Sequence, residues 1–398
     1  MRKDGTRPWR AAGIACTLLL GLVSCSGSRA GGIGDARVPA GYRLETLATD
    51  LGGPRLMAFA PDGALVIGTR SGTVWRLEPP YRHATPLLHL SNYPHSVAFR
   101  DGNILVAQND GIYRAPYAPD RAPLDAKLWV RLPAGGGHTS RTVGVGPDGR
   151  VYAALGLSGN CSDQYIGPPY DFRNRRGGVM VLDESGAEPR WRPFATGLRN
   201  PVGFDWQPET GVLYATNNGP DHHGFDEPAE YFVRARAGDF FGLPWYVLIG
   251  GRIVRDDCVT SDPPHPVSDV KRPVATFPAR NAPLGMAFAR TGPWAGDALV
   301  ALHGSWATQP YGGSMGPDAS RRPPAIVRVH FEHGQATGRV TDVVTGFQDP
   351  DSGDRWARPA GVAVGPDGFL YFTSDQGANA LFRLRPVDDA ATTDGGTE

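Results

Sequence analysis

A short phrase recurs six times along the chain and constrains its fold more than any single residue does. Each copy has apolar residues, a tight turn that usually contains Asp-Gly, and then a second apolar run such as ALVIGT or FLYFTS. The copies span Met57–Gly63, Val97–Gly102, Val143–Gly149, Phe204–Gly211, Met286–Asp297 and Val362–Gly368. A strand–turn–strand unit repeated at intervals of about 40 residues or more is typical of a β-propeller, with one copy per blade. The sequence therefore predicts an all-β, six-bladed propeller.

One propeller domain is expected over residues 41–384. Tyr42–Leu47 alternates polar and apolar residues as a half-buried strand does, and Leu381–Leu384 is the last strand-like run. We expect the N-terminal strand to pair into the last blade, because this pairing removes the open sheet edges. The tail over residues 385–398 has little apolar surface to bury and is predicted to be disordered.

Composition and motifs exclude several classes of function. The chain has 398 residues, of which 20% are charged, and a formal net charge of +0, so a nucleic-acid partner is not indicated. The 53 glycines and 37 prolines fit the many turns of a propeller. Nucleotide-binding glycine fingerprints, a Walker loop, the zinc-protease motif and the serine-hydrolase elbow are absent from the sequence.

The N-terminal segment is predicted to direct export. Four basic residues precede the apolar stretch Ala11–Val23, which is too short for a comfortable membrane span of about 20 residues. The stretch ends in Leu-Val-Ser-Cys, which favours a bacterial lipoprotein signal over residues 1–25 with Cys25 as the lipidated residue. An ordinary signal peptide with an incidental cysteine is the alternative. We expect a flexible tether over residues 26–40, a location on the periplasmic side of the outer membrane or on the cell surface, and membrane attachment only through the lipid.

Two cysteines remain for the folded part, Cys161 and Cys258. Export places them in an oxidising compartment, so a disulfide bond between two loops is favoured. A zinc site needs more ligands than these two residues supply.

The blades are predicted to be unequal, because the spacing of the copies grows after the third one. The extra residues fall in Ser158–Arg176, Asp221–Pro278 and Ala307–Arg322. Long insertions in a compact domain are usually functional, so these three loops predict one elaborated face.

Equivalent positions ahead of each copy should converge on the propeller axis. The four-residue windows there are Gly52–Arg55, Asn92–His95, His138–Arg141, Arg199–Val202, Asn281–Leu284 and Ala357–Ala360. They hold four arginines, two histidines and three asparagines, where a purely structural turn would favour Gly, Asp and Ser. A ring of cations and amides predicts an anionic or quinone-like ligand, or an oxyanion that forms during a reaction.

His138 is the strongest candidate for catalysis. It follows three glycines, and imidazole titrates near working pH as a general base should. Arg199 and Asn200 form a second candidate, since a guanidinium group is a rigid donor for carboxylates and carbonyl oxygens. Arg358 has the same potential. The alternatives are an ordinary hydrogen-bonding histidine and surface ion pairs.

Residues 217–221 read Asn-Asn-Gly-Pro-Asp, and further acidic residues follow. Oxygen-rich loops of this kind suit a hard cation such as Ca²⁺, whereas a plain turn is an equal alternative.

Taken together, these residues resemble the PQQ-dependent glucose/sorbosone dehydrogenases, which are six-bladed propellers. The resemblance covers almost all of residues 41–384 and is closer to the sorbosone branch. It rests on the Asp-Gly repeats, His138, and the phrases Leu198–Gly203, Asn218–Pro220, His303–Trp306 and Arg358–Ala363.

The resemblance implies an oxidoreductase that oxidises a sugar, aldose or polyol and passes electrons to an external quinone, cytochrome or dye. His138 would take the substrate's hydroxyl proton while a hydride passes to C5 of PQQ. Arg199 would stabilise charge on the C5 oxygen, and Arg199, Asn200 and Arg358 would contact the cofactor. Main-chain oxygens of Gly219 and Pro220 would hold Ca²⁺ as a Lewis acid.

Two positions depart from the soluble glucose enzymes. Gly137 replaces an Asp ahead of the base, so another group must orient His138. His303 stands where those enzymes carry a cofactor-binding lysine, and it is the candidate for that contact here.

Two other functions remain open from the sequence. A calcium-dependent propeller lactonase or related hydrolase would need carboxylates among its metal ligands, and the six windows contain none. A non-enzymatic lipoprotein could use the propeller face for binding.

Overall fold

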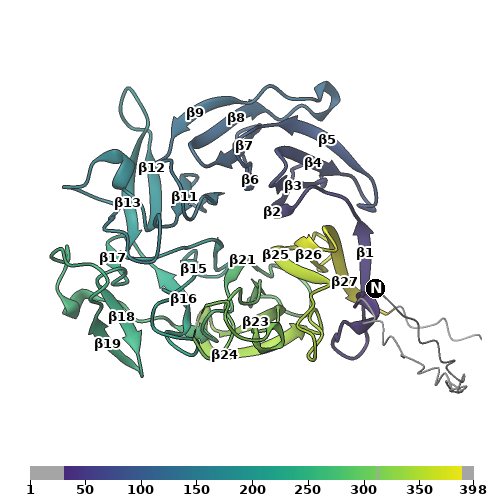
Figure 1. Ribbon diagram of the computed structural model, residues 1–398. Helices are drawn as coiled ribbons and strands as arrows, with labels where there is room; N and C mark the ends of the chain where they lie inside the picture. Colours follow the sequence, from purple (N-terminus) through teal and green to yellow (C-terminus); the bar gives the residue numbers. More distant parts are fainter. Residues whose placement is uncertain (1–30, 312, 388–398) are drawn as a thin grey trace, which may run out of the picture. The chain divides into compact units, whose positions relative to one another are not determined.

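The computed structural model describes residues 31–311 and 313–387. Six sheets surround a common axis in this part of the chain (Figure 1), which confirms the predicted six-bladed propeller. The signal segment, Cys25, the start of the tether and most of the tail lie outside the described residues. Within them, no helix is long and apolar enough to cross a membrane.

The first two blades are regular four-stranded antiparallel sheets in chain order. Blade 1 contains β2 (Pro54–Phe59), β3 (Leu65–Thr69), β4 (Thr73–Leu77) and β5 (Ala84–His89). Blade 2 contains β6 (Ser96–Arg100), β7 (Asn103–Gln108), β8 (Gly111–Pro116) and β9 (Lys127–Arg131).

Blades 3 and 4 share the long insertion between them. Blade 3 contains β10 (Arg141–Val145), β11 (Val151–Leu155), β12 (Gly178–Asp183), β13 (Arg190–Thr196) and the parallel strand β17 (Asp239–Phe240). Blade 4 contains β14 (Phe204–Trp206), β15 (Leu213–Asn217), β16 (Glu230–Ala235) and β20 (Ala275–Phe277). A separate hairpin pairs β18 (Tyr246–Ile249) with β19 (Arg252–Arg255).

The last two blades complete the ring. Blade 5 contains β21 (Pro283–Phe288), β22 (Ala298–Leu302), β23 (Ala325–Glu332) and β24 (Gln335–Val344). Blade 6 contains β25 (Ala357–Val364), β26 (Leu370–Gly377), β27 (Ala380–Pro386) and the N-terminal β1 (Tyr42–Ala48). Short 3₁₀ helices lie at Ile33–Asp35, Pro119–Arg121, Phe172–Asn174, Val267–Asp269 and Asp318–Ser320.

The predicted closure of the ring is confirmed by β1 and β27, which lie side by side (Figure 1). They pair antiparallel, with Tyr42 opposite Pro386 and Leu44 opposite Leu384. Strand β27 thus runs two residues past the boundary expected from the sequence. The described part of the tether also has structure, since Arg37 forms a bridge with Thr345.

The Pro-Asp-Gly copies that end at Gly63, Gly149 and Gly368 form turns of one geometry. In the copy that ends at Gly63, the N–H of this glycine donates to the Ala60 carbonyl at 2.9 Å, and Gly63 has φ +84°. The Asp62 carboxylate accepts the N–H of Ala64 at 3.1 Å. Asp provides the side-chain acceptor that this turn needs and Gly provides the left-handed backbone, so the same phrase recurs.

The insertion expected over Asp221–Pro278 is only partly an insertion. Its residues include β16 and β20, which are the third and fourth strands of blade 4. The additional structure is β17 and the β18–β19 hairpin between them. The expectation was wrong here because a long gap between two repeats also contains the outer strands of its own blade.

Hydroxyl groups on the first and second strands of the blades join neighbouring blades near the axis. Ser96 Oγ donates to the Arg141 carbonyl at 3.1 Å, and Thr216 Oγ1 donates to the Leu284 carbonyl at 2.8 Å. Thr373 Oγ1 of blade 6 donates to the Arg55 carbonyl of blade 1 at 2.7 Å. These bonds fix the height of the windows relative to one another.

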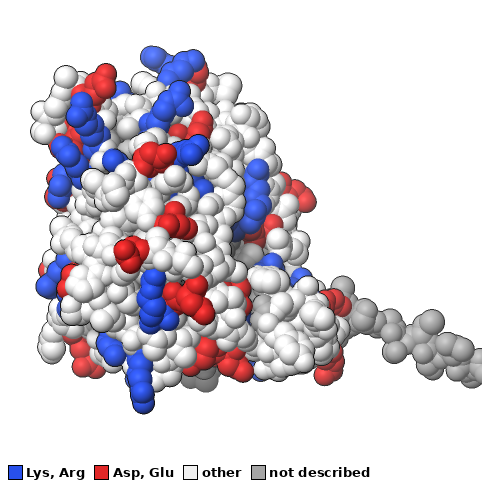
Figure 2. Space-filling view, turned by 60° about the vertical axis from the view of Figure 1, so that its left-hand side comes forward, with Lys and Arg blue, Asp and Glu red and all other residues white. Residues whose placement is uncertain are grey.

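The two ends of the axis differ in character. The windows lie where the inner strands begin, and at their other ends the inner strands line a cavity of about 580 Å³. Its walls are mostly apolar and include Met57, Phe99, Val145 and Met286. The face of the molecule shown in Figure 2 carries both signs of charge interspersed, in line with the net charge of zero. The chemistry-bearing residues are therefore gathered at the window end.

Candidate active site

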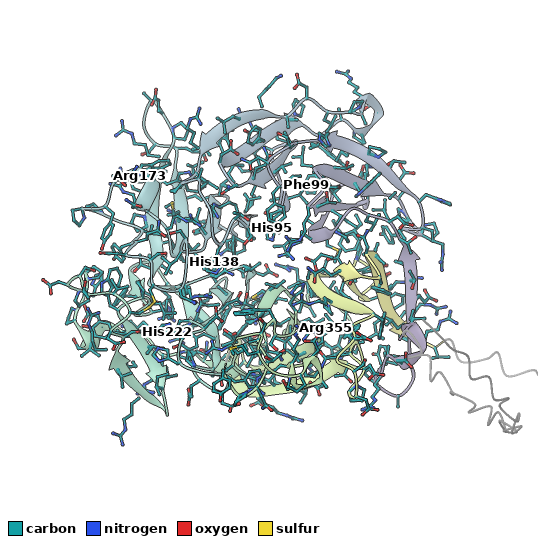
Figure 3. All side chains as sticks on the ribbon, viewed as in Figure 1. His95, Phe99, His138, Arg173, His222 and Arg355 are labelled. Carbon is teal, nitrogen blue, oxygen red and sulfur yellow. A yellow bond between two sulfur atoms is a disulfide. The ribbon has the colours of Figure 1, made fainter. Side chains whose placement is uncertain are left out.

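His138 is placed by the loop that connects β9 to β10. Figure 3 shows it, with His95, near the centre of the ring of blades. Its Nδ1 lies 2.5 Å from the Leu157 carbonyl. A carbonyl only accepts, so Nδ1 carries the proton and Nε2 of the neutral ring is left as the basic atom. The carbonyl of Leu157 thus supplies the orienting contact that the sequence left open.

Gly137 is required by close packing of the backbone. Its φ is +74°, and a Cβ atom at this position would clash with the main chain of Ser158. An aspartate therefore cannot stand ahead of His138 in this loop, and the orienting role passes to the main chain.

Two buried arginines donate hydrogen bonds to carbonyls of the loop that contains Gly135–Gly137 and His138. Arg141 donates to the carbonyls of His138 at 2.7 Å and of Pro133 at 2.8 Å. Arg176 donates to the carbonyls of His138 at 2.8 Å and of Gly136 at 3.0 Å. Both side chains are at most 1% exposed, and burial lowers the pKa of Arg141 to about 9 and that of Arg176 to about 10.

The same arginines keep His138 in its neutral form. Burial, followed by the charges of Arg199, Arg176 and Arg141, lowers the pKa of His138 to about 3 despite the Leu157 hydrogen bond. The imidazole is therefore unprotonated at neutral pH, as a proton acceptor must be.

Arg199 and Asn200 lie next to His138, as the sequence predicted. Gly156 separates them so closely that a Cβ there would meet both Asn200 Oδ1 and His138 Cβ. Arg199 donates to Asp221 Oδ2 at 2.9 Å and also bonds Asn160. Arg199 Nε and Asn200 Oδ1 are buried and have no partner among the described residues, so both remain available to a ligand.

The remaining predicted cofactor residues, His303 and Arg358, lie on another part of the ring. Arg358 donates to the carbonyl of His303 at 3.0 Å and to Gln376 Oε1 at 2.6 Å. His303 Nε2 donates to Asp375 Oδ1 at 2.7 Å, and burial in the main lowers the pKa of His303 to about 4.

Asp375 is the centre of this second group and was missed by the sequence analysis. Its carboxylate accepts from Arg55 at 2.5 Å and from Arg70 at 3.0 Å in addition to His303. Burial alone would raise its pKa, but Arg55 and the other cations hold the pKa of Asp375 well below its usual range. His95 joins the group through Arg55, whose guanidinium lies 3.5 Å from His95 Nε2.

A second set of equivalent positions could have revealed Asp375. In blades 1, 5 and 6, Pro54 pairs with Thr69, Pro283 with Leu302 and Pro359 with Ser374. The residues that follow these partners are Arg70, His303 and Asp375. Each inner hairpin thus delivers two side chains to the axis, and the sequence analysis considered only the first.

We name two regions of this site. The His138 side comprises His138, Arg141, Arg176, Arg199 and Asn200, and the Asp375 side comprises Arg55, Arg70, His95, His303, Arg358 and Asp375. His95 Nδ1 lies 3.1 Å from the Arg141 carbonyl and so connects the two sides.

Gly219 and Pro220, the predicted calcium ligands, follow β15. The N–H of Gly219 donates to Glu230, whose burial raises the pKa of its carboxyl to about 7. The Pro220 carbonyl, however, accepts from the guanidinium of Arg280, which also lies 3.4 Å from Asp221 Oδ1. A Ca²⁺ ion on that oxygen would lie close to a buried positive charge, so the arrangement as it stands does not fit calcium at Pro220.

The site does fit a polyanionic cofactor. Seven arginines (55, 70, 141, 176, 199, 280 and 358) gather at this end of the axis, against three carboxylates (Asp221, Glu230 and Asp375). Most of these guanidinium groups are shielded from water, so an anionic ligand would offset charge that the protein leaves uncompensated. PQQ is a tricarboxylated quinone and matches this requirement.

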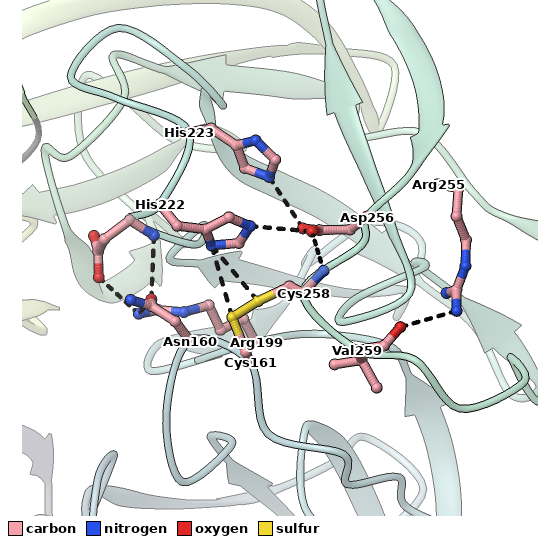
Figure 4. The surroundings of a disulfide bond; sticks show 10 residues. Asn160, Cys161, Arg199, His222, His223, Arg255, Asp256, Cys258 and Val259 are labelled. Atoms are coloured by element: carbon pink, nitrogen blue, oxygen red, sulfur yellow. Dashed lines mark hydrogen bonds and ion pairs between the residues drawn. A yellow bond between two sulfur atoms is a disulfide. The ribbon is translucent and has the colours of Figure 1, made fainter.

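Cys161 and Cys258 are joined by a disulfide bond with a Cα–Cα distance of 5.2 Å (Figure 4). The bond ties the loop after β11 to the segment after β19. Cys161 adjoins Asn160, which bonds both Arg199 and the N–H of Asp221. The disulfide therefore helps to hold Asn160 in place, and Asn160 in turn contacts Arg199 of the His138 side.

Comparison with protein families and with known sequences finds the following similarities. A family model described as TrAA12-like matches residues 259–384. An uncharacterized protein of Borreliella burgdorferi is 22% identical over 369 residues, which are 87% of this chain and 90% of that protein.

Three solved structures share the fold. A carbohydrate-active enzyme of family AA12 from Trichoderma reesei, solved with iodide, has a TM-score of 0.73 at 19% identity over 88% of this chain and 98% of its own. The holo pyranose dehydrogenase PQQ domain from Coprinopsis cinerea has a TM-score of 0.71 at 19% identity, over 88% and 97%. The PQQ-bound aldose sugar dehydrogenase from Streptomyces coelicolor has a TM-score of 0.61 at 19% identity, over 88% and 99%. The fold is thus that of the PQQ-dependent sugar dehydrogenases, and the resemblance predicted from the sequence is confirmed at this level.

Proposed function

We propose that this protein is a PQQ-dependent sugar dehydrogenase that oxidises a sugar, aldose or polyol. The observation that carries the proposal is the excess of buried guanidinium groups over carboxylates around a neutral histidine whose Nε2 is basic. The similar structures include PQQ-bound sugar dehydrogenases, which supports the assignment.

In the proposed mechanism the protein binds, orients and moves one proton. PQQ, when bound, supplies a two-electron acceptor for the hydride that leaves the substrate carbon. His138 Nε2 accepts the hydroxyl proton, and the Leu157 carbonyl keeps the ring in the required tautomer. Arg199 and Asn200 offer their unpartnered polar atoms to the cofactor, with Arg199 stabilising negative charge on the quinone oxygen.

Arg358 would hold a carboxylate of the cofactor from the other side of the ring, and His303, whose Nε2–H is taken by Asp375, would position Arg358 through its main-chain carbonyl. Arg358 is fixed by two main-chain carbonyls, those of His303 and Gly304, at 3.0 and 2.9 Å. Burial lowers the pKa of Arg358 to about 10, which leaves the group charged at neutral pH.

Calcium would fit the Gly219–Pro220 segment only after Arg280 moves. A calcium structure of the Trichoderma reesei enzyme is among the similar structures. In this chain, Ca²⁺ would have to displace Arg280 from the Pro220 carbonyl, while Gly219 presents its own carbonyl in the same segment. No step of the proposed mechanism therefore involves the ion.

The hydrolase alternative gains no support from the carboxylates near the axis. Asp375 is occupied by Arg55, Arg70 and His303, and Asp221 by Arg199. Carboxylates paired in this way are poor candidates for metal ligands of a lactonase.

Titration of the purified protein with PQQ tests the proposal directly. We expect a saturable absorbance change of the cofactor and, after reconstitution, dye reduction with at least one aldose or polyol. An external quinone, cytochrome or dye would take the electrons. Absence of PQQ binding would overturn the assignment.

We also propose export as a lipoprotein, attached through Cys25 on the periplasmic side of the outer membrane or on the cell surface. The supporting observations are the signal-like segment and the disulfide bond, which suits an oxidising compartment. Replacing Cys25 by Ala should release the protein from the membrane fraction, and retention there would contradict the anchor.

A further inference from the structure

Two histidines converge on one buried carboxylate beside the disulfide bond. His222 Nε2 lies 3.0 Å from Asp256 Oδ1, and His223 Nε2 lies 3.0 Å from Asp256 Oδ2 (Figure 4). The two imidazole rings are neighbours, with 4.0 Å between their centroids. Three potential ligand atoms thus approach one another from two separate segments of the chain.

The spacing of these atoms is the spacing found around a metal ion. Bonds from imidazole nitrogen and carboxylate oxygen to such an ion are about 2.1 Å long, so ligands at right angles lie about 3.0 Å apart. Both nitrogen–oxygen distances in the cluster are 3.0 Å. The carboxylate presents one oxygen to each ring, so a single ion bound here would contact both imidazoles and the carboxylate.

The charge at the cluster also calls for a cation. The Asp256 side chain is 1% exposed, and its ion-pair partners among the described residues are the two histidines. A divalent ion bound between these residues would compensate a charge on this buried carboxylate.

Access and ring orientation are both suitable. The histidine side chains are 28% and 24% exposed, so an ion can reach them from solvent. His222 Nδ1 faces the sulfur atoms of Cys258 at 3.7 Å and Cys161 at 4.0 Å. A metal ion bound through Nε2 requires the proton of His222 on Nδ1, and these weak acceptors lie where that N–H points.

We propose that His222, His223 and Asp256 form a binding site for a divalent transition-metal ion, distinct from the cofactor site. Two imidazoles and one carboxylate favour ions such as Zn²⁺, Co²⁺, Ni²⁺ or Cu²⁺ over Ca²⁺ or Mg²⁺. The ion cross-links the segment after β15 to the segment after β19, which the disulfide already joins to the loop after β11. Because Asp221 precedes His222 and accepts a hydrogen bond from Arg199, the ion also restrains Asp221 and, through it, Arg199.

Metal titration of the whole purified protein tests the proposal. The protein is stripped with EDTA, kept under non-reducing conditions and titrated with Zn²⁺ by calorimetry and with Co²⁺ by visible absorption. We expect one equivalent to bind, with d–d bands for cobalt, and a rise in Tm of about 4 °C when free Zn²⁺ is about 100-fold above Kd. His223→Ala and Asp256→Asn should each weaken binding by at least about 100-fold, since both remove a direct ligand.

His83→Ala is the matched control, because His83 is exposed and lies in blade 1; its binding curve should equal that of the unaltered protein. Circular dichroism of each variant without metal establishes that it is folded, and His223→Ala carries the test if Asp256→Asn is not.

Three results would each overturn the proposal: no stoichiometric binding, binding that His223→Ala leaves unchanged, or binding only after reduction. The first would make the cluster a hydrogen-bonded one, and the last would assign the ion to the two cysteines.

Discussion

The His138 side and the Asp375 side both combine histidines with arginines, but several of these arginines have different partners. On the His138 side, Arg141 and Arg176 donate to main-chain carbonyls. On the Asp375 side, Arg55 and Arg70 are paired with a buried carboxylate.

Under the proposed function, the His138 side would carry the proton transfer, and the Asp375 network would hold His303 and, through its carbonyl, Arg358 in place. Burial and the charges of nearby arginines keep His138 neutral. Carbonyl oxygens satisfy the donors of Arg141 and Arg176 without cancelling their charge. A carboxylate cancels the charge and leaves a rigid network. Substitutions should therefore affect chemistry on the first side and stability on the second.

The largest expected effect is on stability and follows removal of the central carboxylate. Asp375→Asn should lower the free energy of unfolding by about 3–5 kcal/mol, because Arg55 is left buried and unpaired. Urea unfolding measures it, with Asp318→Asn as the control. Asp318 is 56% exposed and pairs with Arg321, so its loss should cost less than about 1 kcal/mol. Equal losses of unfolding free energy in the two variants would show that Asp375 stabilises the fold no more than an exposed carboxylate does.

The corresponding change on the His138 side should act on turnover. His138→Gln should lower kcat of the PQQ-loaded protein by at least about 100-fold, because the proton acceptor is lost. PQQ affinity and unfolding free energy should stay near those of the unaltered protein, and His83→Ala should change none of the three. Steady-state kinetics with a dye acceptor gives the answer, and unchanged turnover would remove His138 from the role of base.

His303 allows a test of the Asp375 side by pH. The folded pKa of about 4 lies below the ordinary value of about 6.5, so the unfolded chain binds the proton more readily. The contribution is fully present above pH 6.5 and is lost as the pH falls toward 4. Between pH 7 and pH 5, His303→Gln should therefore lose about 2 kcal/mol less stability than the unaltered protein. A larger loss in the variant would mean that His303 is charged against Asp375.

The smallest expected effect concerns Arg280 and calcium. Arg280→Ala should free the Pro220 carbonyl and increase calcium affinity by at least about tenfold, since a like charge is removed from the site. PQQ titrations with and without EDTA should then differ more for this variant than for the unaltered protein. Arg272→Ala, a change on the surface, is the control. Strong calcium dependence in the unaltered protein would show that Arg280 yields its place to the ion.

Much of the site could be found from the sequence because the propeller repeats. The copies located the inner strands, and the window ahead of each copy contained His138, Arg199, Asn200 and Arg358. Asp375 escaped because it lies at the far end of the second strand of its blade, outside any window. Arg176 and Arg280 escaped for another reason, since both reach the axis from connecting segments that do not repeat.

The sequence by itself determined the six-bladed ring and its closure, since the period of strand–turn–strand units and the Asp-Gly turns depend only on local chemistry. Only the tertiary structure decided which charges are cancelled and which persist. It placed the carbonyl of Leu157 against His138, Asp375 between two arginines and His303, and Arg280 on the Pro220 carbonyl. The physical reason is that pKa values and ligand preferences depend on burial and on neighbours that lie far apart in the chain.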